Sequence, residues 1–389
     1  MEKNILTKCA KSLLMVWKID EMAKYNHCII FIPGFKGSTL ENENGDLIWP
    51  NLLRSQFSHT ALNYNLPELG LPNRHHFHST DIVKSIPIIP HIFNYDVFGH
   101  FINQLTIKFS DKIKIITFHY DWRNQLRIAV SDLNKLIIEL RSQGFNKIDL
   151  LCHSMGGLIA SYLLRYGNDD LNSNKNEWLL TSLINKVYLI ATPFRGIMGR
   201  LQDLIIGQKI GLNHTLLSPL SLCTFPSVYF SIPLQKAIKD TTNKEWLLSD
   251  LKTWEHFKFG ILNNESISHE ILDKRKNYLS ACLSSANEFH HLLNVISNEK
   301  PSLPLKFVCI TSNYGKSLSG VEINEISNRL NWQYEQGDGI APLSSTCLPE
   351  PFSIFESKNY LVKSEHAKMM SDTNVQEILW QEISLGLRP

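Results

Sequence analysis

The sequence predicts an α/β fold in which a doubly wound, mostly parallel sheet carries a helical lid or cap insertion. Four apolar segments of strand length alternate with helical patterns between residues 27 and 191. This alternation is typical of a parallel sheet that is covered by helices on both faces. The alternation stops at Gly196, and an apolar strand pattern returns only at 305–311. We therefore expect a long insertion within the sheet.

The first predicted strand, residues 27–32, is an unbroken apolar run, as expected when both faces of a strand are buried. A glycine-rich loop follows it at 33–38. Residues 1–25 have an amphipathic helical pattern and are expected to cap the domain. The other elements predicted before the central motif are a helix over 98–109, a strand over 113–118 and a helix over 125–142.

The central motif joins an apolar strand over 148–151 to a helical pattern through a tight turn at Ser154. A serine on such a turn has its hydroxyl lifted above the sheet, beside the free N–H groups of the following helix. Gly156 and Gly157 supply the small residues that a close strand–helix approach needs. Cys152 stands where the G-x-S-x-G pattern has its first glycine. The alternative is an ordinary strand–turn–helix unit in which Ser154 only caps the helix.

After this motif, residues 186–191 form the fourth predicted strand, and 305–311 continues the sheet. Residues 197–300 show no convincing buried strand but several helical segments rich in Leu, Ile and Trp. We therefore predict a core made of 1–196 and 301–389, closed by a helix over 372–386, and a helical lid or cap over 197–300.

The charge balance and the cysteine content argue against several classes of protein. Lys and Arg number 39 and Asp and Glu 37 among 389 residues, a balance that does not suggest a nucleic-acid partner. Seven cysteines without a C-x-x-C pair argue against a disulfide framework and favour a reducing compartment. No signal peptide or transmembrane pattern is found. We expect a cytoplasmic protein, with export by a route that needs no signal peptide as the alternative.

A cluster of histidines, His75, His76 and His78, suggests a metal site as one interpretation. No acidic or cysteine ligands stand at matching spacing, so we predict neither a metal nor another cofactor.

Three residues occur in the order that acyl transfer by serine requires in this fold: Ser154, then Asp338, then His366. Serine needs a base to accept its proton, and the base needs a carboxylate to orient it. Taken singly, Asp338 is a turn aspartate between two glycines and His366 is one of fifteen histidines. Their shared order and loop context favour a catalytic interpretation.

The motifs together resemble the lecithin:cholesterol acyltransferase family of α/β-hydrolases, especially its soluble bacterial-type members. The matching segments are 33–40, 48–50, 120–123, 153–157, 191–196, 225–229, 337–343 and 365–367. The chain departs from the family at Cys152 and at Ile340–Ala341, and it lacks the paired cysteines of the secreted mammalian members. The last departure argues against action on lipoprotein surfaces.

The resemblance implies roles for individual residues. Ser154 would be the nucleophile, Asp338 the orienting acid and His366 the base. An oxyanion hole would be formed by two backbone N–H groups, those of Lys36 and Met155. Three aromatic residues within the matched segments are expected to contact the substrate: Phe35, Trp122 and Phe194.

The expected function is that of a serine acyl hydrolase or O-acyltransferase that acts on phospholipid or other fatty-acyl esters through an acyl-enzyme. Its partner is then a lipid substrate, and a peripheral membrane contact is compatible with this function. The sequence does not indicate an oligomeric state. Two alternatives remain at this point: a small-ester or lactone hydrolase without lipid preference, and a catalytically silent lipid-binding protein.

Overall fold

The computed structural model describes residues 25–51, 62, 66–70, 76–89, 93–167, 178–210, 213–233, 236–263, 267–296, 301, 305–327 and 329–387. A six-stranded sheet in the order β17-β14-β9-β8-β1-β7 lies at its centre, and all of its strands are parallel. The strands are β1 (His27–Ile32), β7 (Lys114–Thr117), β8 (Lys147–His153), β9 (Lys186–Ile190), β14 (Lys306–Ser312) and β17 (Glu356–Val362). The predicted α/β fold is thereby confirmed.

Alternate residues of these strands enter two separate cores. In β1, Ile30 faces one core and Phe31 the other, because successive side chains of a strand point to opposite faces. Helices α4 (Leu126–Ser142) and α5 (Met155–Tyr166) cover the first face. Helices α3 (Gly99–Phe109) and α11 (Thr373–Leu385) cover the second. The continuous apolar runs of the sequence therefore correspond to strands that are buried on both sides.

The segment between β9 and β14 is only partly helical, which corrects the expectation for 197–300. Its helices are α6 (Gly199–Ile206), α7 (Pro219–Cys223), α8 (Pro226–Tyr229), α9 (Leu251–Phe257) and α10 (His269–Asn294). Its strands are β10 (Gln208–Ile210), β11 (Asn213–Leu217), β12 (Lys236–Asp240) and β13 (Glu245–Leu247). We call this segment, residues 197–296, the cap.

Strands from beyond residue 300 complete the cap. β15 (Gly315–Asn324) pairs with β12, and β16 (Arg329–Gly337) pairs with β15, giving a sheet in the order β13-β12-β15-β16. β12 has polar ends and an alternating burial pattern, so its short sequence resembles an exposed loop. Its β conformation depends on a partner about 80 residues away, which local patterns do not reveal. The division of the chain at 197 and 300 stays a prediction.

Smaller elements lie between β1 and α3. They are β2 (Leu40–Asn42), β3 (Leu47–Trp49), β4 (Phe77–His78), β5 (Ser85–Ile89) and β6 (Phe93–Asp96). The amphipathic segment predicted at 1–25 lies outside the described residues, except for its last residue. None of the helices in the described ranges has the length and apolar character needed to cross a membrane.

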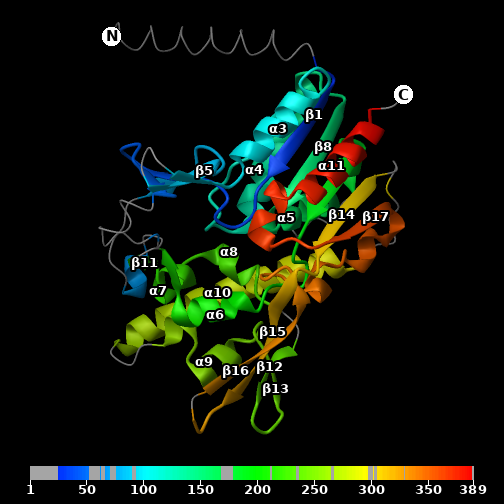
Figure 1. Ribbon diagram of the computed structural model, residues 1–389. Helices are drawn as coiled ribbons and strands as arrows, with labels where there is room; N and C mark the ends of the chain where they lie inside the picture. The colour runs from blue at the N-terminus through cyan, green and yellow to red at the C-terminus, as the bar shows by residue number, and fades with distance from the viewer. Residues whose placement is uncertain are drawn as a thin grey trace, which may run out of the picture.

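Figure 1 shows the cap beyond the carboxyl ends of the sheet strands, with α6, α7, α8 and α10 grouped there. The long helix α10 joins the cap to the core, because Phe289 stacks on Tyr162 of α5 at a ring distance of 4.5 Å. The carboxyl edge of a parallel sheet is where such folds carry their sites. The cap therefore covers the edge at which Ser154 lies.

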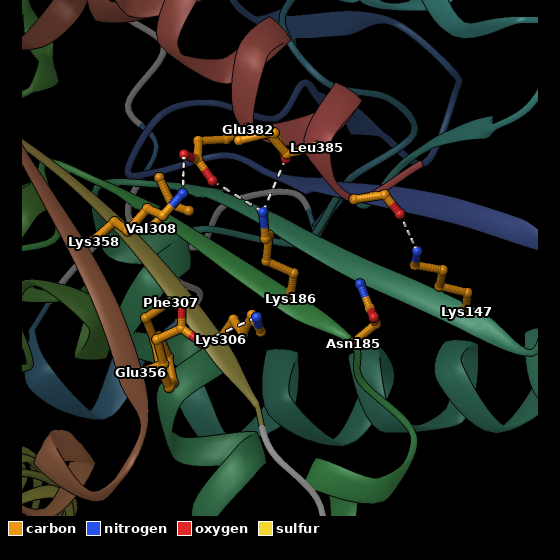
Figure 2. Close-up of a pocket in the computed structure, with 11 residues that line it drawn as sticks. Lys147, Asn185, Lys186, Lys306, Phe307, Val308, Glu356, Lys358, Glu382 and Leu385 are labelled. Carbon is orange, nitrogen blue, oxygen red and sulfur yellow. Dashed lines mark hydrogen bonds and ion pairs between the residues drawn. The ribbon is translucent and has the colours of Figure 1, made fainter. Parts of the chain in front are cut away.

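The opposite edge of the sheet is closed by α11. A cavity of about 220 Å³ lies there, and Figure 2 shows Glu382 of α11 between Lys186 and Lys358. The Glu382 carboxylate accepts hydrogen bonds from Lys186 at 3.1 Å and from Lys358 at 2.7 Å. Lys186 and Lys147 also donate to the carbonyl oxygens of Glu382 and Gly386 at the end of α11, where a positive charge is favourable. These lysines fix the last helix to the sheet.

We expect Glu382→Gln to lower the free energy of unfolding at pH 7 by about 3 kcal/mol, because it leaves Lys186 as a buried, uncompensated charge. Burial alone would raise the pKa of Glu382. The bonds from Lys358, Tyr360 and Lys186 outweigh burial and lower that pKa below its ordinary 4.5. The ion pair between Glu382 and Lys186 therefore contributes its full stabilisation at pH values above 4.5. It loses this contribution as the pH falls through the lower pKa that Glu382 has in the folded protein. Urea unfolding at several pH values should show the two proteins converging at acid pH. If the difference in unfolding free energy between the wild type and Glu382→Gln stayed constant with pH, the stabilising role of the Glu382 charge would be wrong.

Candidate active site

The turn between β8 and α5 holds Ser154 in a backbone conformation that few residues other than glycine adopt. Its φ is 54° and its ψ is −124°. The Ser154 N–H donates to the carbonyl oxygen of Ile190, at the end of β9, over 2.8 Å. A strained residue of this kind persists only where its surroundings enforce it. Here the neighbouring strand and the start of α5 do so.

Two glycines allow α5 to begin so close to the sheet. A Cβ atom added to Gly156 would lie 2.4 Å from the carbonyl oxygen of Ile32. One added to Gly157 would lie 1.9 Å from Oγ1 of Thr192. Both distances are far below contact distance. The helix can therefore approach the main chain of β1 and the side chain of Thr192, which follows β9, only because it has no side chain at these two positions. The small residues of the motif are thus required by packing.

The structure brings Ser154, His366 and Asp338 together from three distant parts of the chain. Nε2 of His366 lies 2.9 Å from Oγ of Ser154, and Nδ1 lies 2.6 Å from Oδ2 of Asp338. His366 begins the 3₁₀ helix His366–Ser371, and Asp338 follows β16. Ser154 is 5% exposed and His366 is 8% exposed, so the chain of bonds is shielded from water. This is the geometry of a nucleophile, a base and an orienting acid.

Asp338 is held as a carboxylate by its own loop. Its Oδ1 accepts the backbone N–H groups of Ile340 at 2.9 Å and Ala341 at 2.6 Å. Burial alone would raise the pKa of Asp338. The charge and hydrogen bond of His366, together with the two backbone N–H groups, outweigh burial and lower the pKa below its ordinary value. The carboxylate can therefore stabilise positive charge on the imidazole.

The loop after β1 passes directly over Ser154. A Cβ atom added to Gly34 would lie 2.7 Å from Cβ of Ser154. Lys36 has a φ of 65°, and its ammonium donates to Oε1 of Gln208 in the cap over 2.8 Å. Burial, followed by the charge of Arg200, lowers the pKa of Lys36 to about 8. Met155 starts α5 on the other side of Ser154. The two residues predicted to form an oxyanion hole thus lie on the two segments that meet at the serine.

The predicted substrate-contacting residues form part of the same neighbourhood. Phe35 is half-buried and packs on Trp122 with a ring distance of 4.9 Å. Trp122 is fully buried, and its indole N–H donates to the carbonyl oxygen of Ser38 over 2.9 Å. Trp122 therefore supports the loop that carries Phe35. Phe194, which follows β9, is buried as well. Substrate contact by these three residues stays a prediction.

Comparison with known proteins places this chain in a family. The family model described as lecithin:cholesterol acyltransferase matches residues 60–284, more than half of the chain. The chain belongs to the lecithin:cholesterol acyltransferase family. The protein named phospholipase A(1) LCAT3 of Arabidopsis thaliana is 26% identical over 325 residues, which cover 70% of this chain and 66% of that protein. The chain thus spans just under two thirds of the length of this relative.

A solved structure supports the fold of this family member. The matching chain of the Tle4–Tli4 complex has a TM-score of 0.54 and 13% identity, and the match covers 92% of the present chain and 98% of that chain. At this identity the likeness concerns the fold alone. The α/β-hydrolase architecture agrees with the parallel sheet, the turn at Ser154 and the placement of Asp338 and His366 after later strands.

Sequence reasoning did not single out several residues around the site. His153 contacts the main chain of His366, and Arg200 of the cap lies 4.3 Å from the centre of the Phe35 ring. His153 begins the matched segment 153–157, but neither contact is predicted by the sequence, because each depends on how distant segments meet. Within the described ranges, no group of three or more His, Cys, Asp or Glu side chains could hold a metal ion. His75, from the histidine cluster, lies outside those ranges.

We predict that Gly34→Ala lowers kcat for ester hydrolysis about 100-fold, because its methyl group would displace Ser154 relative to His366. The matched control is Gly315→Ala, whose added Cβ would meet no atom within 4 Å. The control should keep its kcat to within about twofold. Steady-state rates and circular dichroism on both variants provide the test. Equal activity of the two variants would show that the close approach at Gly34 does not matter.

Proposed function

We propose that this family member is a serine acyl hydrolase or O-acyltransferase that acts on lipid esters through an acyl-enzyme intermediate. The continuous contact from Ser154 through His366 to Asp338 carries this proposal. Membership of the lecithin:cholesterol acyltransferase family supports a fatty-acyl ester as the substrate, as does the name of the Arabidopsis relative, a phospholipase.

The first half-reaction forms the acyl-enzyme. Oγ of Ser154 attacks the ester carbonyl carbon while Nε2 of His366 accepts the hydroxyl proton. The Asp338 carboxylate accepts a hydrogen bond from Nδ1–H of His366, which keeps the proton on Nδ1 and leaves Nε2 free as the base. Negative charge develops on the former carbonyl oxygen, where the N–H groups of Lys36 and Met155 would donate to it. The intermediate then collapses as His366 returns the proton to the departing alcohol oxygen.

The second half-reaction repeats these steps with a new nucleophile. Water gives a free fatty acid, and an alcohol gives a new ester. His366 removes the proton from the incoming hydroxyl and delivers it to Oγ of Ser154 as the acyl group leaves. The same residues serve both outcomes, so the acceptor depends on what reaches the acyl-enzyme.

The cap controls access in this proposal. Ser154 is almost inaccessible, and the cap contacts both segments that flank it. Gln208 accepts a bond from Lys36, and Oγ of Ser231 lies 3.8 Å from Sδ of Met155. A substrate with long acyl chains needs these contacts to open, as in other enzymes with lids. A lipid interface would favour the open state by binding the apolar surface that opening of the cap exposes.

Variants of the three central residues test the mechanism. Ser154→Ala and His366→Ala should each lower kcat at least ~10³-fold, and the double variant little further, because the residues act as one unit. Asp338→Asn should lower kcat about 10⁴-fold, because an amide facing Nδ1 favours the wrong tautomer of His366. Near-native hydrolysis by Ser154→Ala would exclude the proposed nucleophile.

Movement of the cap can be tested through the physical state of the substrate. The initial rate is measured against concentration for an ester that forms micelles, above and below its critical micellar concentration. We expect a sharp rise in rate at the transition, because the interface stabilises the open cap. A smooth saturation curve without a break would favour a rigid cap and a small-ester substrate.

A further inference from the structure

His153 is the last residue of β8, immediately before Ser154, and it is a buried histidine that the steps above do not use. It is 6% exposed. Its Nε2 lies 3.1 Å from the main-chain carbonyl oxygen of His366, and the two imidazole rings are 5.0 Å apart between their centres. The residue beside the nucleophile therefore contacts the backbone of the base.

The contact defines which nitrogen of His153 carries the proton. A carbonyl oxygen can only accept, so Nε2 of His153 must be the donor. Nδ1 is then the unprotonated nitrogen, and it has no hydrogen-bond partner among the described residues. Burial, and next the nearby charge of His366, lowers the pKa of His153 to about 3. His153 is thus a neutral donor throughout the range in which a histidine base works.

Neutrality matters because His366 becomes positively charged during each half-reaction. A charged imidazole at the position of His153 would oppose that charge across a short, dry distance. A neutral Nε2–H donor holds the carbonyl oxygen of His366 without this penalty. The N–H of His366 donates to the carbonyl oxygen of Asp338 over 2.9 Å. The backbone of His366 is therefore held on both sides of its Cα atom.

We propose that His153 is a positioning residue for the catalytic base: its Nε2–H anchors the main chain of His366 so that the imidazole reaches Ser154. The inference rests on the proposed function. The anchor links the two partners of the proton transfer, since His153 directly precedes Ser154 at the end of β8 and has a hydrogen bond with His366. Without it, His366 keeps its bond to Asp338 but loses its fixed distance from Oγ of Ser154.

Variants at 153 separate positioning from packing. The amide nitrogen of His153→Gln can occupy the place of Nε2, whereas that of His153→Asn is too short and falls near the place of Nδ1. We expect the Gln variant to keep kcat to within about threefold, and the Asn and Phe variants to lose about tenfold or more. KM should change by less than about twofold in all three, because substrate binding is untouched.

The matched control is His27→Phe. His27 is also 6% exposed, and its Nε2–H donates to Oδ2 of Asp149 over 2.9 Å, but it lies at the opposite edge of the sheet. The His27→Phe variant should have a lower free energy of unfolding but a kcat within about twofold of the wild-type value. Active-site titration with a fluorophosphonate corrects every kcat for the fraction of folded protein. Equal kcat values for the Gln and Asn variants, or a loss confined to KM, would overturn the proposal.

A measurement on the wild-type protein does not depend on any variant being active. Nitrogen-15 spectra of the histidine rings report tautomer and charge. We expect one ring to remain in the neutral Nε2–H form from pH 5 to pH 8, and this signal to be absent in His153→Gln. Assignment of the Nδ1–H form or of a titrating ring to His153 would overturn the inference. Inactive wild-type protein with the expected signal would instead exclude the proposed function alone.

Discussion

The structure depends on one close contact, in which the start of α5 meets the backbone of β1 on one side and the side chain of Thr192, which follows β9, on the other. Gly156 and Gly157 have no room for a side chain against Ile32 and Thr192. This contact forces the chain to turn within a single residue, and that residue, Ser154, takes a left-handed φ of 54°. The cost of such a conformation is a few kcal/mol at most, and burial of α5 against the sheet offsets it. Packing therefore sets the direction of the serine hydroxyl, which points toward His366.

The parallel sheet brings the other groups to the same place. Loops that follow parallel strands all leave the sheet at one edge, so the loop with Gly34, the turn at Ser154 and the segment with His366 converge there, after β1, β8 and β17. Asp338 follows β16, which belongs to the second sheet, and contacts His366 at the same place. Backbone hydrogen bonds then hold each group. Asp338 is fixed by its own loop, and the main chain of His366 is fixed by Asp338 and His153. The polar site is rigid because its support comes from main-chain atoms.

Much of this arrangement could be predicted from the sequence. Strands such as β1 and β8 are buried on both faces, so they appear as unbroken apolar runs. The three central residues follow the chain order of the fold, and their motifs resemble one family. β15 and β16 were not predicted, because they are half-exposed and pair mainly with each other. β12 was not predicted, because it is half-exposed and pairs with β15, which is distant in sequence. The hydrogen bonds from His153 to His366 and from Lys36 to Gln208 could not be predicted either, because they join segments that are remote in sequence.

The proposed mechanism requires Ser154 to be a nucleophile that His366 activates. Fluorophosphonates react with activated serines and leave a stable phosphonyl group on the oxygen. The most direct measurement is to treat the purified protein with such a reagent, digest it and locate the added mass by mass spectrometry. We expect a single adduct on Ser154, and none in His366→Ala protein that remains folded. An unmodified Ser154, or an adduct on a different serine, would show that Ser154 is not the nucleophile.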